Sequence, residues 1–223
     1  MLGGELFRDL PAPELRRLVS IAERRRFSRN EVVFHRGDPA DTVHLIARGR
    51  FAARVVTPAG DTVIISVHGS GDAFGELALL EVEQTRSTTV AALEPGGTYA
   101  VRRGDFTRLR QQYPAVNEVL VRLLADRLRR TSELLVEAFF VGAETRVLRR
   151  IGELAALYGG GAPGTVIPLS QSEIAGLAGT SRATINRVLR AEAKRRTVEL
   201  HRGQTIVVDP VALAKRAKAS GHA

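Results

Sequence analysis

Residues 171–190 read QSEIAGLAGTSRATINRVLR, and this stretch decides the architecture of the C-terminal part of the chain. Ser170 can cap a first helix, and Glu173, three residues later, completes a capping box. Gly179 can then supply a tight turn, and Ser181 can cap a second helix. The spacing predicts two short helices joined by that turn.

Each of the two predicted helices has an apolar face, made of Ile174, Leu177, Ala178, Ile185, Val188 and Leu189. Ala175 is small, so the second helix can cross the first closely at the steep angle of a helix-turn-helix. The outward face of the second helix carries Arg182, Ala183, Asn186, Arg187 and Arg190. Its arginines suit guanine edges and phosphates. The alternative is an ordinary helical hairpin with an arginine-rich surface.

The C-terminal part also holds most of the excess positive charge. Residues 1–140 contain 20 Arg and no Lys against 18 acidic residues, a net charge of +2, whereas residues 141–223 contain 13 Lys and Arg against 6 acidic residues, a net charge of +7. This asymmetry suggests a polyanion-binding domain joined to a nearly neutral one, unless the charge only aids solubility. Residues 200–208 predict a β-hairpin, or wing, whose turn at residues 201–204 can contact phosphate.

The composition of the 223-residue chain excludes several classes of protein. Hydrophobic residues at 44% and charged residues at 26% are ordinary globular values. The absence of cysteine excludes disulfides, thiolate metal sites and cysteine nucleophiles. No apolar run approaches the roughly 20 residues of a membrane span, and residues 1–10 lack a signal-peptide core. We therefore expect a cytoplasmic protein without membrane association.

The central part of the chain alternates short β-type runs with glycine-containing turns. These runs are residues 31–35, 42–47, 50–57, 61–68, 86–92 and 98–102. Short strands at this spacing predict an antiparallel roll, barrel or sandwich. An amphipathic segment at residues 12–21 predicts a helix in front of it, and residues 145–158 predict another behind it.

In the β-type runs before Pro114 apolar residues recur at every second position, whereas after Pro114 they recur at intervals of three or four residues. The positions concerned are Val116, Leu120, Leu123, Leu124, Leu128, Leu134 and Leu135. No Pro or Gly interrupts the chain before Gly142, so a helix about 40 Å long is expected at roughly 1.5 Å per residue. A small barrel cannot cover such a stripe, which favours pairing with a second copy over packing on the C-terminal domain. We expect Gly142 to act as a hinge.

A candidate ligand site lies at residues 71–78, which read GDAFGELA, and at the Arg-Ser pair that follows. Gly75 would let the backbone approach a ligand, and Glu76 can accept hydrogen bonds from a ribose hydroxyl. Arg86 offers a forked cation to a phosphate, with the Ser87 hydroxyl beside it. The alternative is a structural salt bridge between Glu76 and Arg86.

Taken together, these motifs resemble the cAMP receptor protein/FNR family of bacterial transcription regulators over nearly the whole chain. The resemblance implies an α+β protein with a cyclic-nucleotide-binding β-roll (1–113), a dimerisation helix and hinge (114–141) and a winged helix-turn-helix (142–223). It implies a cAMP-responsive regulator without enzymatic activity, cofactor or metal. A homodimer would bind pseudo-palindromic double-stranded DNA, and RNA polymerase is a further candidate partner.

The family also implies site residues. For cAMP these are Gly75, Glu76, Leu77, Arg86, Ser87, Arg127, Thr131 and Ser132; the hydroxyl pair on the long helix would bond the adenine, one hydroxyl coming from the partner subunit. For DNA they are Ser170, Gln171, Ser181, Arg182, Ala183, Thr184, Asn186, Arg187, Arg190 and Gln204.

The sequence also departs from the family pattern. Ala183 stands where the family often has a glutamate that accepts a hydrogen bond from cytosine, which puts the familiar half-site in doubt. Thr88 replaces a usual small residue. The absence of cysteine removes the iron–sulfur branch, and His35, His44 and His68 are better read as surface or core residues than as haem ligands. Alternatives are a different effector, DNA binding without a cyclic nucleotide, or a C-terminal domain that contacts protein.

Overall fold

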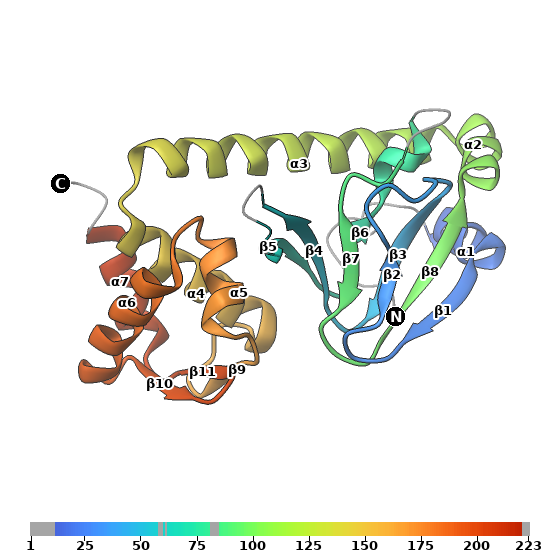
Figure 1. Ribbon diagram of the computed structural model, residues 1–223. Coiled ribbons are helices and arrows are strands. Elements are labelled where there is room, and N and C mark those ends of the chain that lie inside the picture. Colours follow the sequence, from blue (N-terminus) through green and yellow to red (C-terminus); the bar gives the residue numbers. More distant parts are fainter. Residues whose placement is uncertain (1–11, 58–59, 61, 81–84, 220–223) are drawn as a thin grey trace. The chain divides into compact units, whose positions relative to one another are not determined.

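The computed structural model describes residues 12–57, 60, 62–80 and 85–219 (Figure 1). The chain divides into two compact units: Met1–Val55 with Ile65–Arg130, and Val56–Ile64 with Thr131–Ala223. The first eleven residues, and Asp61 at the start of one predicted strand, lie outside the described residues. Among the described helices, none combines the length and apolarity that a bilayer crossing requires.

The N-terminal part of the chain forms two four-stranded β-sheets, with strand orders β1-β8-β3-β6 and β2-β7-β4-β5. The strands are β1 (Glu23–Phe27), β2 (Val32–Phe34), β3 (Thr42–Arg48), β4 (Phe51–Val56), β5 (Thr62–His68), β6 (Ala73–Phe74), β7 (Thr89–Ala92) and β8 (Gly96–Arg102). β8 pairs antiparallel with β1 and β3, and β7 pairs antiparallel with β2 and β4. The predicted antiparallel β-roll is confirmed.

Strand β1 is absent from the sequence prediction. Its residues read ERRRF, and only Phe27 is buried. The strand therefore lacks the alternation of apolar and polar residues by which a half-buried strand is recognised. It lies at the edge of its sheet, where a row of arginines discourages pairing with another chain.

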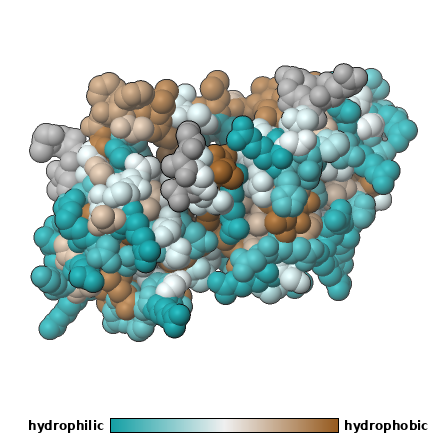
Figure 2. Space-filling view, in the orientation of Figure 1, coloured by the Kyte–Doolittle hydropathy of each residue, from teal (hydrophilic) through white to brown (hydrophobic). Residues whose placement is uncertain are grey.

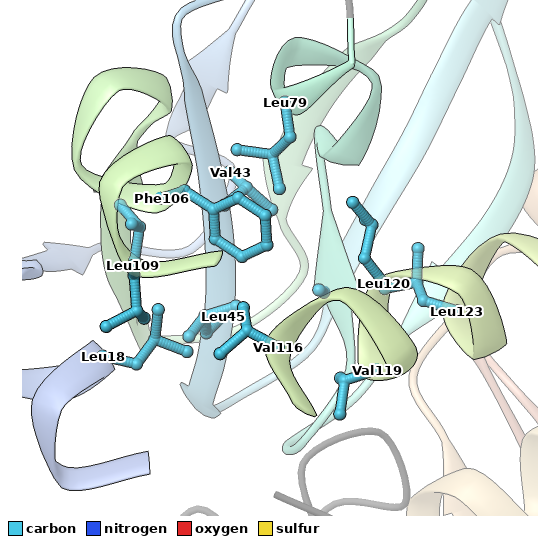
Figure 3. Packing of buried hydrophobic residues seen from close by; sticks show 12 residues of the cluster. Leu18, Val43, Leu45, Leu79, Phe106, Leu109, Val116, Val119, Leu120 and Leu123 are labelled. Atoms are coloured by element: carbon cyan, nitrogen blue, oxygen red, sulfur yellow. The ribbon is translucent and has the colours of Figure 1, made fainter. Parts of the chain in front are cut away.

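Helices cover one face of the roll and close its core (Figure 3). They are α1 (Ala12–Ile21), the short 3-10 helix η1 (Glu76–Leu79), α2 (Arg103–Gln112) and the start of α3 (Pro114–Phe140). Figure 3 shows their side chains converging on β3. The cluster consists of Leu18, Val43, Leu45, Ala73, Leu79, Val101, Phe106, Leu109, Val116, Val119, Leu120 and Leu123. Helix α1 confirms the predicted amphipathic segment.

Helix α3 is a single helix of 27 residues, as the uninterrupted stretch after Pro114 predicts. One face of its first turns is buried, at Val116, Val119, Leu120 and Leu123. Farther along, Leu128 is 69% exposed, Leu135 58% and Phe139 75%. Figure 2 shows hydrophobic surface along this helix. The apolar stripe is therefore longer than the part that the β-roll covers.

The C-terminal part contains helices and a small sheet with the strand order β10-β11-β9. The elements are α4 (Ala143–Gly159), β9 (Thr165–Ile167), α5 (Gln171–Leu177), α6 (Arg182–Lys194), β10 (Val198–His201), β11 (Gln204–Val207) and α7 (Pro210–Ala219). The predicted helix at 145–158, the two helices within 171–190 and the wing hairpin are all present. The wing begins two residues earlier than predicted, at Val198, and β9 and α7 were not predicted.

Candidate functional site

The first unit contains a hollow between the β-roll and Arg127, which lies midway along α3. It encloses about 550 Å³, part of it open to solvent. The side chains around it come from β5, from the β6–η1 turn, from residues 85–90 and from α3. They include six of the eight predicted ligand residues, namely Gly75, Glu76, Leu77, Arg86, Ser87 and Arg127. Thr131 and Ser132 do not line it; they are exposed residues of α3 in the second unit.

Gly75 is needed for the shape of this hollow. It caps the N-terminus of η1 with a φ of 77°, a left-handed conformation that side chains disfavour. A Cβ at this position would lie 2.7 Å from Nη1 of Arg86 and 3.2 Å from the carbonyl oxygen of Thr42. The glycine thus allows the turn and the arginine to pack against each other.

Arg86 is held mainly by strand β3, and a longer ion pair joins its Nη2 to Oδ1 of Asp41 at 3.9 Å. Its Nη1 donates to the carbonyl oxygen of Thr42 and its Nη2 to Oγ1 of Thr42, both at 2.7 Å. The guanidinium lies over the ring of Phe34, 4.1 Å from its centroid. The side chain is 5% exposed, and its Nε is buried and has no hydrogen-bond partner among the described residues. Burial lowers the pKa of Arg86, although nearby carboxylates oppose that shift.

Glu76 pairs with Arg127. The carboxylate is buried, and its Oε2 lies 3.3 Å from Nη2 of Arg127 on α3. The alternative of a structural bridge between Glu76 and Arg86 is not found among the described residues. Glu76 and Arg86 therefore remain two distinct polar groups, one anionic and one cationic, on the same hollow.

His68 also lines the hollow, although no sequence motif predicts that it belongs to the site. Its Nε2 lies 3.4 Å from Nη1 of Arg127 and 3.0 Å from Oγ of Ser66. Burial, with a smaller contribution from the Arg127 charge, lowers the pKa of His68 to about 3. The imidazole is therefore neutral near pH 7 and can accept a hydrogen bond from the arginine. A histidine in a strand gives no sequence signal for this contact.

His44 belongs to the core of the roll. It stacks on Phe74 with ring centroids 5.1 Å apart, and its Nδ1 lies 3.0 Å from Oγ1 of Thr98. Burial, followed by the charges of Arg86 and Arg25, lowers the pKa of His44 to about 3. His35 is exposed. No group of three or more His, Asp or Glu within the described ranges is arranged to hold a metal ion.

The helix-turn-helix has the predicted caps. The backbone N–H of Glu173 donates to Oγ of Ser170 at 3.3 Å, and the N–H of Ser170 donates to Oε2 of Glu173 at 2.8 Å. The N–H of Thr184 donates to Oγ of Ser181 at 3.2 Å, which starts α6. Gly179 adopts a φ of 57° in the turn. The predicted inward residues Ile185, Val188 and Leu189 are at most 1% exposed.

The outward face of α6 forms one wall of a polar groove. Arg182, Ala183, Arg187 and Arg190 are exposed, whereas Thr184 and Asn186 are half-buried. The start of α5 and the wing form the other walls. The groove residues are Leu169, Ser170, Gln171, Ser172, Arg182, Asn186, His201, Arg202, Gly203, Gln204 and Thr205. The predicted DNA residues Ser170, Gln171, Arg182, Asn186 and Gln204 are thus brought together.

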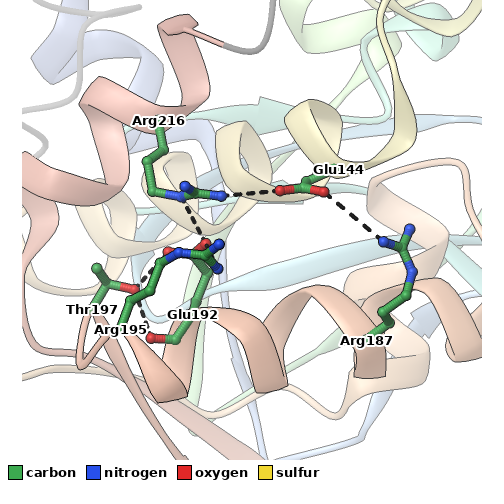
Figure 4. Close-up of polar contacts among 6 residues, drawn as sticks. All are labelled: Glu144, Arg187, Glu192, Arg195, Thr197 and Arg216. Carbon is green, nitrogen blue, oxygen red and sulfur yellow. Dashed lines mark hydrogen bonds and ion pairs between the residues drawn. The ribbon is translucent and has the colours of Figure 1, made fainter.

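Ion pairs around the buried Glu192 and the more exposed Glu144 join α6 to α4 and α7 (Figure 4). Glu192 is fully buried, and its Oε1 accepts a hydrogen bond from Nε of Arg216 at 2.8 Å. Nη2 of Arg216 also donates to Oε1 of Glu144 at 3.0 Å. The second oxygen of Glu144 lies 4.0 Å from Nη1 of Arg187, a predicted DNA residue. No spacing in the sequence predicts this network.

Arg146 ties the start of α4 to the helix-turn-helix. Its Nε and Nη2 donate to the carbonyl oxygens of Ala178 and Gly179, both at 3.0 Å. Its Nη1 donates to the carbonyl oxygen of Val141 at 2.7 Å. One side chain therefore satisfies carbonyl groups at the turn and beside the predicted hinge.

Two family models match the chain. A cyclic nucleotide-binding domain matches residues 24–113, and a Crp-like helix-turn-helix domain matches residues 145–216. The CRP-like cAMP-activated global transcriptional regulator of Mycobacterium tuberculosis is 31% identical over 195 residues, 86% of this chain and 87% of the relative. The cyclic AMP receptor protein of Thermus thermophilus is 33% identical over 213 residues, 96% of each chain.

Solved structures agree with these matches. The catabolite activator protein of Thermus thermophilus has a TM-score of 0.55 at 31% identity, covering 96% of this chain and 98% of that one. The c-di-GMP responsive global regulator CLP of Xanthomonas campestris has a TM-score of 0.76 at 22% identity, covering 89% of this chain and 99% of that one. The similarity to the Xanthomonas campestris regulator concerns the fold alone.

Proposed function

Because the chain belongs to the CRP/FNR family of DNA-binding transcription regulators, which are not enzymes, we propose that it is a cAMP-responsive homodimer acting on pseudo-palindromic operators. Its N-terminal part is a cyclic nucleotide-binding domain and its C-terminal part a Crp-like DNA-binding domain. The identity of the nucleotide, the dimer and the operator are the proposed parts. We assign residues 1–113, 114–141 and 142–223 to ligand binding, dimerisation and DNA binding.

One observation carries the ligand proposal: Arg86 is buried in the hollow, and no residue that the structure describes accepts a hydrogen bond from its Nε. A buried cation with an unsatisfied donor favours an anionic ligand, because the ligand would replace lost hydration. The cyclic phosphate of cAMP supplies such an anion, and Ser87 can add a hydroxyl. Glu76 can accept from the ribose hydroxyl, and such a bond would compete with or extend its contact with Arg127.

The exposed part of α3 supports the dimer proposal. Leu128 and Leu135 are exposed and lie seven residues apart, so they recur on one face of the helix. Pairing with a second α3 would bury this face. It would also bring Thr131 and Ser132 of two chains together, as the family pattern implies for adenine binding.

For DNA, the groove between α6 and the wing supports binding in the major groove with contacts to the backbone on either side. Two copies of α6 in a symmetric dimer would read half-sites about 10 base pairs apart, or a multiple of that distance. Arg182 would read guanine, and Gln204 on the wing would contact phosphate. RNA polymerase is proposed as a further partner of the bound dimer.

Ligand and DNA would be linked through the dimer. If cAMP favours the DNA-binding arrangement, DNA must equally favour cAMP binding. Coupling free energies of about 1–3 kcal/mol correspond to a change in operator affinity of about 5- to 150-fold. A ligand that bound both arrangements equally would change nothing.

The experiment is a selection of bound DNA from a random pool by the purified full-length chain, with and without cAMP. The proposal predicts a two-fold symmetric motif that is enriched more strongly with cAMP. Calorimetry with cAMP, cGMP and cyclic di-GMP tests the effector; cyclic di-GMP is included because the Xanthomonas regulator of the same fold responds to it. Equal enrichment with and without every nucleotide would reject ligand control and leave a constitutive DNA-binding regulator.

A further inference from the structure

The recognition surface of α6 includes an amide whose orientation is set by a neighbouring helix. Nδ2 of Asn186 donates to Oε1 of Gln171, the first residue of α5, at 3.1 Å. Both side chains are half-buried and line the groove beside the wing. The bond restricts rotation of the Asn186 side chain, so its polar atoms are arranged before DNA arrives.

The hydrogen-bonding capacity left on Asn186 is specific. An asparagine amide has two N–H donors and one carbonyl acceptor, and Gln171 takes one of the donors. One donor and one acceptor remain. Within the part of the chain that the structure describes, no other side-chain hydrogen bond of Asn186 occurs.

In the major groove, only adenine offers an acceptor and a donor side by side on one base, its N7 and N6. Guanine presents two acceptors, so the asparagine oxygen would face another oxygen. Cytosine offers a donor alone, and thymine an acceptor and a methyl group. A fixed donor–acceptor pair therefore matches adenine best.

The neighbouring side chains of α6 cannot offer a base the same pair of one donor and one acceptor. Ala183 has no side-chain hydrogen-bonding group, and Arg182 presents donors only. Nη1 of Arg187 lies 4.0 Å from a carboxylate oxygen of Glu144, and this residue too has only donors. The Thr184 hydroxyl, bonded to Oγ of Ser181 at 3.1 Å, is a single oxygen and cannot present a donor and an acceptor side by side. Among the described residues of this face, the Asn186 amide thus combines a separate donor and acceptor and is oriented by a second side chain.

We propose that Asn186, positioned by Gln171, reads an adenine in the major groove, so that each operator half-site contains an A·T pair opposite Asn186. The inference rests on the proposed DNA-binding function and specifies one position of its target. Gln171 acts as a positioning residue for this contact.

The first test compares motifs selected from a random pool by the full-length wild type, Asn186→Ala and Gln204→Ala, with cAMP present. We expect Asn186→Ala to lose the preference for adenine at one position of each half-site and to keep the others. Gln204→Ala, the matched amide on the wing, should keep every position and weaken binding to all sequences. Gln171→Ala should weaken the adenine preference without changing which base is favoured.

If the Gln171–Asn186 hydrogen bond only stabilises the fold, a different result is expected. The variants would then lower the thermal midpoint and weaken binding to all sequences in proportion, with an unchanged motif. That result would overturn the inference and leave the proposed function intact. A wild type that selects no motif under any condition would overturn both.

The second test leaves the protein unchanged. In the selected operator, 7-deazaadenine replaces adenine at the assigned position and removes the N7 acceptor. We expect wild-type affinity to fall by about 5-fold or more, the lower end for a bidentate base contact, and Asn186→Ala affinity to stay the same. An unaffected wild type, or an equal loss in both proteins, would overturn the inference.

Discussion

Replacing Glu192 with alanine tests the ion-pair network that fixes α6. The Glu192 side chain is fully buried. It accepts hydrogen bonds from Nε of Arg216 at 2.8 Å and from Oγ1 of Thr197 at 2.7 Å. Nη1 of Arg195 also lies 3.5 Å from Oε1. Alanine would remove both carboxylate oxygens and leave two cations and a hydroxyl to be satisfied elsewhere.

The expected loss in the free energy of unfolding depends on which hydrogen bonds the partners of Glu192 keep. Removing one member of a buried ion pair costs about 3–5 kcal/mol. Arg216 is 30% exposed and keeps its bond to Glu144 at 3.0 Å, and the Thr197 hydroxyl keeps the backbone carbonyl oxygen of residue 192 at 3.1 Å. Because these hydrogen bonds and solvent contacts remain, we expect the loss in stability to lie near the lower end of that range. We expect Glu192→Ala to lower the free energy of unfolding by about 3 kcal/mol.

The assay is urea and thermal unfolding followed by circular dichroism. A loss of about 3 kcal/mol corresponds to a fall of roughly 6–12 °C in Tm for a chain of this size. Glu192→Gln keeps a neutral acceptor and should lose less. Glu199→Ala is the matched control, because Glu199 is 62% exposed and its contact with His201 is 3.7 Å long. The control should stay within about 0.5 kcal/mol of wild type. A Glu192→Ala protein as stable as the control would refute the reasoning.

Three further variants address ligand, DNA and pH. Arg86→Ala should weaken cAMP binding on the order of 100-fold in calorimetry, because it removes a charged donor from the phosphate. Glu144→Gln should tighten DNA binding by about 2- to 5-fold in a gel shift, because an exposed pair worth up to about 1 kcal/mol no longer competes for Arg187. The pKa of His68 is lowered to about 3 in the folded chain, from an ordinary value of 6.5. The unfolded chain therefore binds more protons between these pH values, and stability should fall from pH 6.5 toward 3 by up to about 1.4 kcal/mol per pH unit from this group. His68→Gln should show a shallower fall in the urea midpoint.

Each of these predictions has a contrary outcome. Unchanged cAMP affinity in Arg86→Ala would remove the phosphate assignment. DNA binding by Glu144→Gln no tighter than that of Glu118→Gln, a charge-matched change at an exposed position of the first unit, would show that Glu144 does not restrain Arg187. Identical pH profiles for wild type and His68→Gln would show that this histidine is not held neutral by the fold.

Local patterns were sufficient for the helix-turn-helix. The helix caps and the turn involve only residues that are close together in sequence, so spacing alone predicts them. These residues are Ser170, Glu173, Gly179 and Ser181. The long helix is equally local, since its length follows from the absence of Pro and Gly. Strand β1 could not be predicted, because its exposed arginines conceal the strand period.

The partners of charged side chains depend on the tertiary fold. Arg86 contacts Thr42, which lies 44 residues away in sequence, and Arg127 contacts Glu76 at a separation of 51 residues. Arg216 reaches back 72 residues to Glu144. With many arginines in the chain, spacing does not indicate which one pairs with a given carboxylate. The ligand residues could be predicted from a family resemblance, whereas their contacts required the fold.

The proposed control of this regulator requires that a ligand bound to the N-terminal domain changes the affinity of the C-terminal domain for DNA. The most direct measurement is the equilibrium affinity of the full-length protein for its selected operator, at one stated salt concentration, without nucleotide and with saturating cAMP. We expect cAMP to tighten binding by about 5- to 150-fold. The same affinity in both conditions, from a protein that calorimetry shows to be loaded with cAMP, would contradict the account.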